Sequence, residues 1–143
     1  MNDRYHIFDH TADAGIEISG RTITGLFITA AAGMYQIIGI SDAYSGTSIT
    51  RMKLIEPTTE DLLVSFLNEL NYLLTVRNKI FCPIMNLTIE PIGNDLLLNA
   101  SAGTYNLSQS DLSGLKEIKS VTYHQLRIVR EQGEYHARVI FDI

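Results

Sequence analysis

The sequence predicts an α+β fold, in which two helices pack on a mostly antiparallel β-sheet. Two segments carry apolar residues at three-to-four spacing, and several shorter segments alternate between apolar and polar residues. Their order is strand, helix, strand, helix and then several hairpin strands, which is not the regular alternation of a parallel α/β protein. With 143 residues, of which 45% are hydrophobic, we expect one domain spanning residues 1–143.

The two helices are predicted over residues 22–38 and 60–76. In the first, Thr22 or Thr24 can cap the start, and Gly39 suits a left-handed stop. In the second, residues 57–61 supply a cap and early negative charge against the helix dipole. Both segments place their large apolar residues on one face, as a helix buried on one side requires.

The remaining segments predict strands, with two hairpins in the second half of the chain. The alternating segments are residues 14–19, 49–55, 84–92, 96–102, 121–130 and 134–143. Residues 93–95 read Gly-Asn-Asp, a favourable turn between the third and fourth of these, and Gly133 lies in the turn between the last two.

Composition and charge restrict the class of protein. With a net charge of −5, the chain lacks the broad basic surface of a nucleic-acid-binding protein. We therefore expect any role near RNA to depend on a protein partner. The single cysteine, Cys82, cannot form an internal disulfide. No signal-peptide pattern and no apolar run of about 20 residues is present, so we expect a cytoplasmic protein without a membrane partner.

Polar residues gather at two places. Asp9, His10 and Asp13 precede an alternating segment, where such residues either form a turn or supply functional groups. At the other end of the chain, Asp142 stands beside the α-carboxylate of Ile143. Neighbouring anions repel unless a cation lies between them, and Ca²⁺ or Mg²⁺ collects several such oxygens. The two places together could form a cation site, whereas the alternative for the second place is a frayed, solvated terminus.

The last hairpin adds a prediction of register. If its turn holds three residues, Thr122 lies opposite Asp142 and His124 opposite Ile140, on one face of the sheet. Lys119 precedes that strand and points toward the same end of the hairpin. We therefore expect a polar cluster of Lys119, Thr122 and Asp142, which a slip of one residue would scatter.

At these residues the sequence resembles the archease family, whose members assist the tRNA-splicing RNA ligase. The resemblance covers essentially the whole chain, and its main departure is Ser120 in place of a usual alanine. It rests on separated blocks in matching order and spacing: residues 10–13 with Gly15, residues 22–27 with Ala31, Gly33 and Met34, residues 61–63 and 66–70, residues 118–124, and residues 141–143.

The resemblance implies a compact α+β fold with a site for one divalent metal ion. Matched residue by residue, this site falls on Asp13, Asp142 and the main-chain oxygens of Ile143. Calcium is the expected ion, with magnesium or manganese as alternatives.

The resemblance also implies a function in tRNA processing. The family acts on the tRNA-splicing RNA ligase, promoting its guanylylation with GTP and its repeated turnover, and is not itself an enzyme. Lys119 matches a lysine that the family needs for activity, and His10, Thr122 and His124 are further functional candidates in the matched blocks.

Two other classes of function remain open on the residues alone. A metal-dependent hydrolase could use Asp13 and Asp142, with Lys119 or His124 assisting, although metal-assisted hydrolysis also needs an open coordination position and a water nucleophile. A chaperone-like interaction protein would be consistent with the small size and acidity of the chain.

Overall fold

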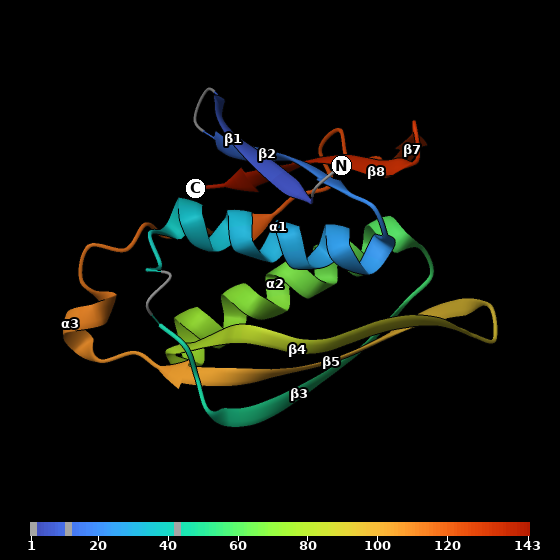
Figure 1. Ribbon diagram of the computed structural model, residues 1–143. Helices are drawn as coiled ribbons and strands as arrows, with labels where there is room; N and C mark the ends of the chain where they lie inside the picture. Colours follow the sequence, from blue (N-terminus) through green and yellow to red (C-terminus); the bar gives the residue numbers. More distant parts are fainter. Residues whose placement is uncertain (1–2, 11–12, 42–43) are drawn as a thin grey trace. The chain divides into compact units, whose positions relative to one another are not determined.

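The computed structural model describes residues 3–10, 13–41 and 44–143, and confirms the α+β class (Figure 1). Every strand pairing within these residues is antiparallel. The chain divides into two compact units: unit 1 comprises Met1–Ile38 with Lys116–Ile143, and unit 2 comprises Gly39–Leu115. That the two units act as one domain stays a prediction.

Unit 1 is an antiparallel sheet with one helix, α1, packed on one of its faces. The sheet has the order β1-β2-β8-β6, and β7 pairs with another part of β8. The helix α1 contacts β1, β2 and β8. The elements are β1 (Arg4–His10), β2 (Asp13–Gly20), α1 (Ile23–Ile38), β6 (Ser120–Val121), β7 (Val129–Glu131) and β8 (Glu134–Asp142).

The alternation along β2 and β8 explains which face of this sheet is buried. Ile16 and Ile18 on β2, and Val139 and Phe141 on β8, have at most 1% of their surface exposed. The helix packs closely on them, since a Cβ added at Gly33 would lie 3.2 Å from the Ile16 side chain. As a result, the residues between these positions face away from α1.

Unit 2 is a three-stranded antiparallel sheet of order β3-β5-β4, with a long helix on one face (Figure 1). The side chain of Thr58 accepts a hydrogen bond from the Asp61 amide at 3.1 Å and caps that helix, while Asn78 ends it in the left-handed conformation. The elements are β3 (Ser48–Glu56), α2 (Thr59–Arg77), β4 (Lys79–Ile92), β5 (Asp95–Asn106) and a short α3 (Gln109–Leu112).

Both predicted long helices are confirmed to within one residue at each end. The amide of Gly25 donates to Thr22 Oγ1 at 2.9 Å, so Thr22 caps α1, and Gly39 follows its last turn with a φ of +99°. The hairpin between β4 and β5 is also confirmed, with Ile92 opposite Asp95 around a two-residue turn. The strand β1 was not predicted.

The predicted continuous strand over residues 121–130 is wrong, because only its two ends lie in strands, β6 and β7. Glu131 pairs with Glu134 around the two-residue turn Gln132-Gly133, not a three-residue turn. Both turn residues have positive φ, 54° and 78°, which gives the turn type whose twist matches that of the flanking strands. Between β6 and β7, residues 122–128 are not part of a strand. These seven residues stand opposite only four residues of β8, so the loop holds three residues more than continuous pairing would allow.

Candidate functional site

The two predicted metal-ligating carboxylates lie directly opposite each other. Asp13 begins β2, Asp142 ends β8, and the antiparallel register pairs the two residues. On the far side of β8, Ser120 of β6 also pairs with Asp142, and on the far side of β2 the backbone of His10 pairs with Asp13. One row across four strands therefore collects residues from both ends of the sequence.

This row lies on the outward face of the sheet of unit 1. Asp13 and Asp142 alternate with the buried residues that contact α1, and opposed residues of an antiparallel pair point to the same face. Asp142 is exposed and Asp13 is half-buried. Two carboxylates on adjacent strands at the same level repel each other, and a cation between them would remove that repulsion.

Lys119 is attached to this row through its backbone. Its amide donates a hydrogen bond to the carbonyl oxygen of Asp142 at 2.8 Å. The Lys119 side chain is exposed, and Ile143, which follows Asp142, has 43% of its surface exposed. The structure thus places the backbone of Lys119 beside the strand end that presents Asp142 and Ile143.

The predicted pairing of Thr122 with Asp142, and of His124 with Ile140, is wrong, because the turn register differs and Ser120 occupies the place opposite Asp142. Thr122 nevertheless stays close to the end of β8, because it directly follows β6. Its amide and its Oγ1 both donate hydrogen bonds to the carbonyl oxygen of Ile140, at 3.0 and 3.1 Å. The amide of His124 donates to Thr122 Oγ1 at 3.3 Å, and its side chain is exposed.

The donor set fits a hard divalent cation in chemistry but supplies only part of a coordination shell. Across residues 3–10, 13–41 and 44–143, no three side chains of His, Cys, Asp or Glu gather as a metal cluster. Two carboxylates leave the remaining positions to main-chain oxygens and water, as Ca²⁺ and Mg²⁺ permit. The side chain of His10 and the whole of Thr11 lie outside the described residues.

Sequence reasoning missed a second polar group on the same outward face. Ser19 Oγ and His136 Nδ1 lie 2.9 Å apart, across the pair that β2 and β8 form. They line a groove of about 450 Å³ with the charged residues Glu17, Arg127, Glu131 and Arg138. Ser19 and His136 are 117 positions apart in sequence, so only the register brings them together.

Among the described residues of unit 1, the most buried charged residue is Glu134, with 7% of its surface exposed. Its Oε2 accepts a hydrogen bond from Arg4 Nη1 at 2.9 Å. That hydrogen bond holds the pKa of the Glu134 carboxyl below its ordinary value. The pair joins β1 to the start of β8 and has a structural role.

Comparison with known proteins shows the family to which this chain is similar. The model of the Archease protein family (MTH1598/TM1083) matches residues 5–143. Protein archease of Methanosarcina barkeri is 32% identical over 98% of this chain and 96% of its own length. Protein archease of Thermococcus gammatolerans is 28% identical over 98% of this chain and 99% of its own length.

Solved structures are similar over nearly the whole chain as well. The solution structure of Methanobacterium thermoautotrophicum protein 1598 superposes with a TM-score of 0.79 at 25% identity, covering 97% of this chain and 98% of that one. The crystal structure of a Thermotoga maritima protein, named an archease and possible chaperone, has a TM-score of 0.61 at 22% identity and shares the fold, covering 95% of this chain and 94% of its own. None of the helices in the described part of the chain has the length and apolarity to cross a membrane. The chain belongs to the archease family.

Proposed function

We propose that this protein is a metal-binding accessory protein that activates the tRNA-splicing RNA ligase. In this role it promotes the GTP-dependent guanylylation of the ligase and its repeated turnover in the cytoplasm. It meets RNA only through the ligase and catalyses no reaction of its own. Membership of the archease family and the row formed by Asp13 and Asp142 support the proposal.

The observation that carries the metal-binding part is the register of β2 and β8. It puts Asp13 opposite Asp142 on an outward face, where both carboxylates can be reached from solvent. The main-chain oxygens of Ile143 follow directly and complete the proposed ligand set. A bound Ca²⁺, or Mg²⁺ or Mn²⁺ in its place, would supply positive charge that offsets the repulsion between the two carboxylates.

Two of the proposed functional residues, His10 and Lys119, are joined to these ligands through the backbone. The Lys119 amide is hydrogen-bonded to the main-chain carbonyl of Asp142, and this contact holds the backbone of Lys119 beside the carboxylate row. Its exposed ammonium is free to reach an acidic group or a phosphate of the ligase complex. His10, Thr122 and His124 are the further candidates for contact with the ligase.

A two-part assay tests the activator role. The purified protein is first incubated alone with generic ester and phosphoester substrates, and then with a cognate ligase, Mn²⁺, GTP and nicked tRNA. We expect no turnover in the first mixture and faster multiple-turnover ligation in the second. Hydrolysis in the first mixture that is lost in Asp13→Asn would instead support a metal-dependent hydrolase.

Calorimetric titration with Ca²⁺ tests the metal site separately from the ligase. We expect one site in the wild-type protein, with markedly weaker binding in Asp13→Asn and in Asp142→Asn. Wild-type binding in both variants would exclude a site shared by these two carboxylates.

A further inference from the structure

The strand β3 is a long free edge of the sheet in unit 2. The strand order β3-β5-β4 leaves its outer side without a partner strand among the described residues. Nine residues, Ser48–Glu56, thus present a row of main-chain donors and acceptors along that side. Such edges pair readily with another extended chain unless side chains prevent it.

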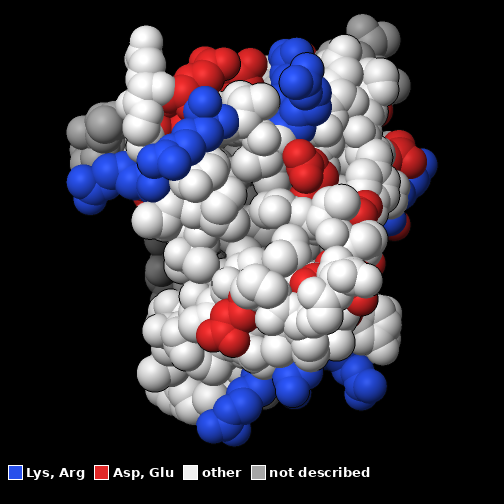
Figure 2. All heavy atoms as spheres, turned by 90° about the vertical axis from the view of Figure 1, so that its right-hand side faces the viewer, with Lys and Arg blue, Asp and Glu red and all other residues white. Residues whose placement is uncertain are grey.

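The side of β3 that faces away from α2 is positively charged. Arg51 and Lys53 are exposed on this side, and the register pairs them with Ser101 and Asn99 of β5. Within the described part of the chain, neither cation forms an ion pair with an acidic side chain. Figure 2 shows Lys and Arg side chains projecting at the lower end of the view, where Figure 1 has β3.

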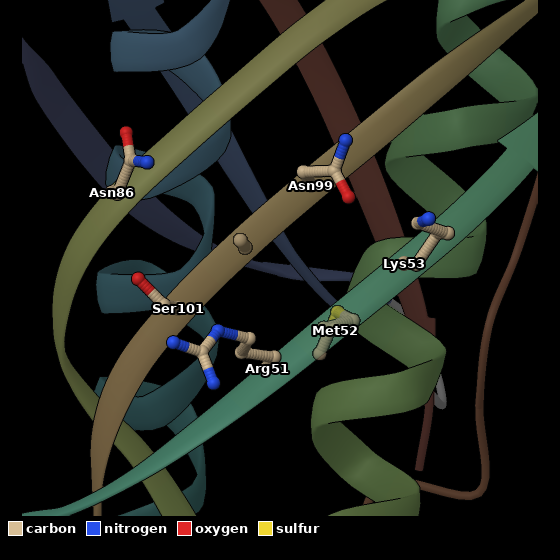
Figure 3. Close-up of a pocket in the computed structure, with 7 residues that line it drawn as sticks. Arg51, Met52, Lys53, Asn86, Asn99 and Ser101 are labelled. Carbon is tan, nitrogen blue, oxygen red and sulfur yellow. The ribbon is translucent and has the colours of Figure 1, made fainter.

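A shallow hollow of about 360 Å³ lies on this charged side (Figure 3). Arg51 and Lys53 border it from β3, while Asn99 and Ser101 border it from β5 and Asn86 from β4. Besides Met52 and Ala100, the hollow is lined by hydrogen-bonding side chains and two cations. These polar groups suit carboxylate side chains that lie beside β3.

The opposite side of the same edge is hollowed too, and its lining combines apolar and charged side chains. A cavity of about 210 Å³ is lined by consecutive residues of β3 from Thr50 to Leu54, together with Leu73 and Glu69 of α2 and Phe81 of β4. Since residues of both alternating sets line this cavity, it opens along the backbone edge of β3. The edge is therefore accessible with a hollow on each side, and on the side of α2 the half-buried Leu54 and Leu73 supply apolar surface.

We propose that the edge of β3 binds an extended segment of a partner protein in which acidic and apolar residues alternate. The added strand would form main-chain hydrogen bonds with residues 50–54 of β3. Its side chains would point alternately to the two sides, so that acidic ones meet Arg51 and Lys53 and apolar ones meet Leu54 and Leu73. This inference is independent of the proposed ligase activation and of the carboxylate row.

The charges on β3 disfavour two other occupants. If two copies of the chain paired antiparallel about Met52, Arg51 of one copy would lie opposite Lys53 of the other, and like charges directly opposite are destabilising. A nucleic acid would meet two cations, Arg51 and Lys53, at this hollow of a chain of net charge −5, whereas nucleic-acid binding rests on many phosphate contacts.

The test uses a fluorescein-labelled seven-residue peptide in which aspartate alternates with valine, titrated with the full chain and followed by fluorescence anisotropy. The comparison peptides are one with lysine in place of aspartate, one with the same residues in blocks, and an oligouridylate of equal length. Amide hydrogen exchange of residues 48–56 is measured with and without the alternating acidic peptide.

The decisive variant is the charge reversal R51E/K53E, with R51Q/K53Q as a milder form and R21E/K116E as the control. All four positions are exposed, and the control changes the net charge by the same amount in unit 1. We expect R51E/K53E to weaken acidic-peptide binding at least tenfold and to gain binding of the lysine peptide, while the control stays within about threefold of wild type. The β3 amides should exchange more slowly in the wild-type complex.

Several results would overturn the proposal. If the block peptide binds as tightly as the alternating acidic peptide, the alternation of acidic and apolar residues does not determine binding. If the exchange rates of the β3 amides do not change in the complex, the peptide does not pair with this edge. Tighter binding of the oligouridylate would indicate a nucleic-acid surface, and concentration-dependent self-association that R51E/K53E abolishes would indicate a second copy of the chain.

Discussion

Replacing Asp142 by asparagine should stabilise the metal-free protein and should also remove most of the stabilisation that Ca²⁺ provides. Directly opposed residues of an antiparallel pair have Cβ atoms roughly 5 Å apart. Two unit charges at this separation repel by about 0.8 kcal/mol in water and about 3 kcal/mol at an effective dielectric constant of 20. Because Asp142 is exposed and Asp13 half-buried, we expect a gain of about 1 kcal/mol at low ionic strength, where screening is weak.

Calcium should reverse this order of stability. A ligand present at 100 times its dissociation constant stabilises the folded state by about 2.7 kcal/mol. The wild-type protein should therefore become more stable than Asp142→Asn once Ca²⁺ is in excess, although it is less stable in chelator. The measurement is urea unfolding of both proteins, with and without Ca²⁺, followed by circular dichroism.

The control for this experiment is Glu90→Gln, which removes an exposed carboxylate from β4 in unit 2. We expect the control to gain as much stability from Ca²⁺ as the wild-type protein does. If Asp142→Asn is less stable than wild type in chelator, the carboxylate repulsion inferred from the register is wrong. If it gains as much from Ca²⁺ as wild type, Asp142 is not a ligand.

Three further predictions follow from individual contacts. The free energy of unfolding of Lys119→Ala should lie within about 0.5 kcal/mol of the wild-type value, because the hydrogen bond from Lys119 to Asp142 uses the backbone. The variant should nevertheless fail to stimulate ligation. A large loss of stability in urea would contradict a direct role of Lys119. Gly103→Ala should destabilise the protein by about 3 kcal/mol, and by more than Gly15→Ala does. The new Cβ would meet backbone atoms at Gly103, whereas at Gly15 it would meet the end of an aromatic side chain. Paired urea titrations of the two variants measure the difference. The hydrogen bond from Arg4 lowers the pKa of Glu134 in the folded state. The stability that this hydrogen bond contributes is therefore present above the ordinary value of 4.5 and is lost as the pH falls through the lowered pKa. The free energy of unfolding measured from pH 6 to 3 should fall less steeply in Arg4→Gln, and parallel profiles would refute the coupling.

Local periodicity and capping were enough to predict part of the fold. The two long helices were predictable because each buries one face and carries capping residues, such as Thr22 and Gly39 for the first and Thr58 for the second. The hairpin between β4 and β5 was predictable because Gly93 adopts the positive φ that its turn requires. These features arise from residues that are close together in the chain.

Tertiary structure alone decided the register of β8 and hence the details of the site. A two-residue turn at Gln132 and three extra residues before β7 moved Ser120, rather than Thr122, opposite Asp142. The sequence could suggest Asp13 and Asp142 as ligands through resemblance, but only the pairing of β2 with β8 brings them side by side. Contacts between distant segments are set by how whole elements pack, and a shift of one residue in a strand moves every side chain to the other face.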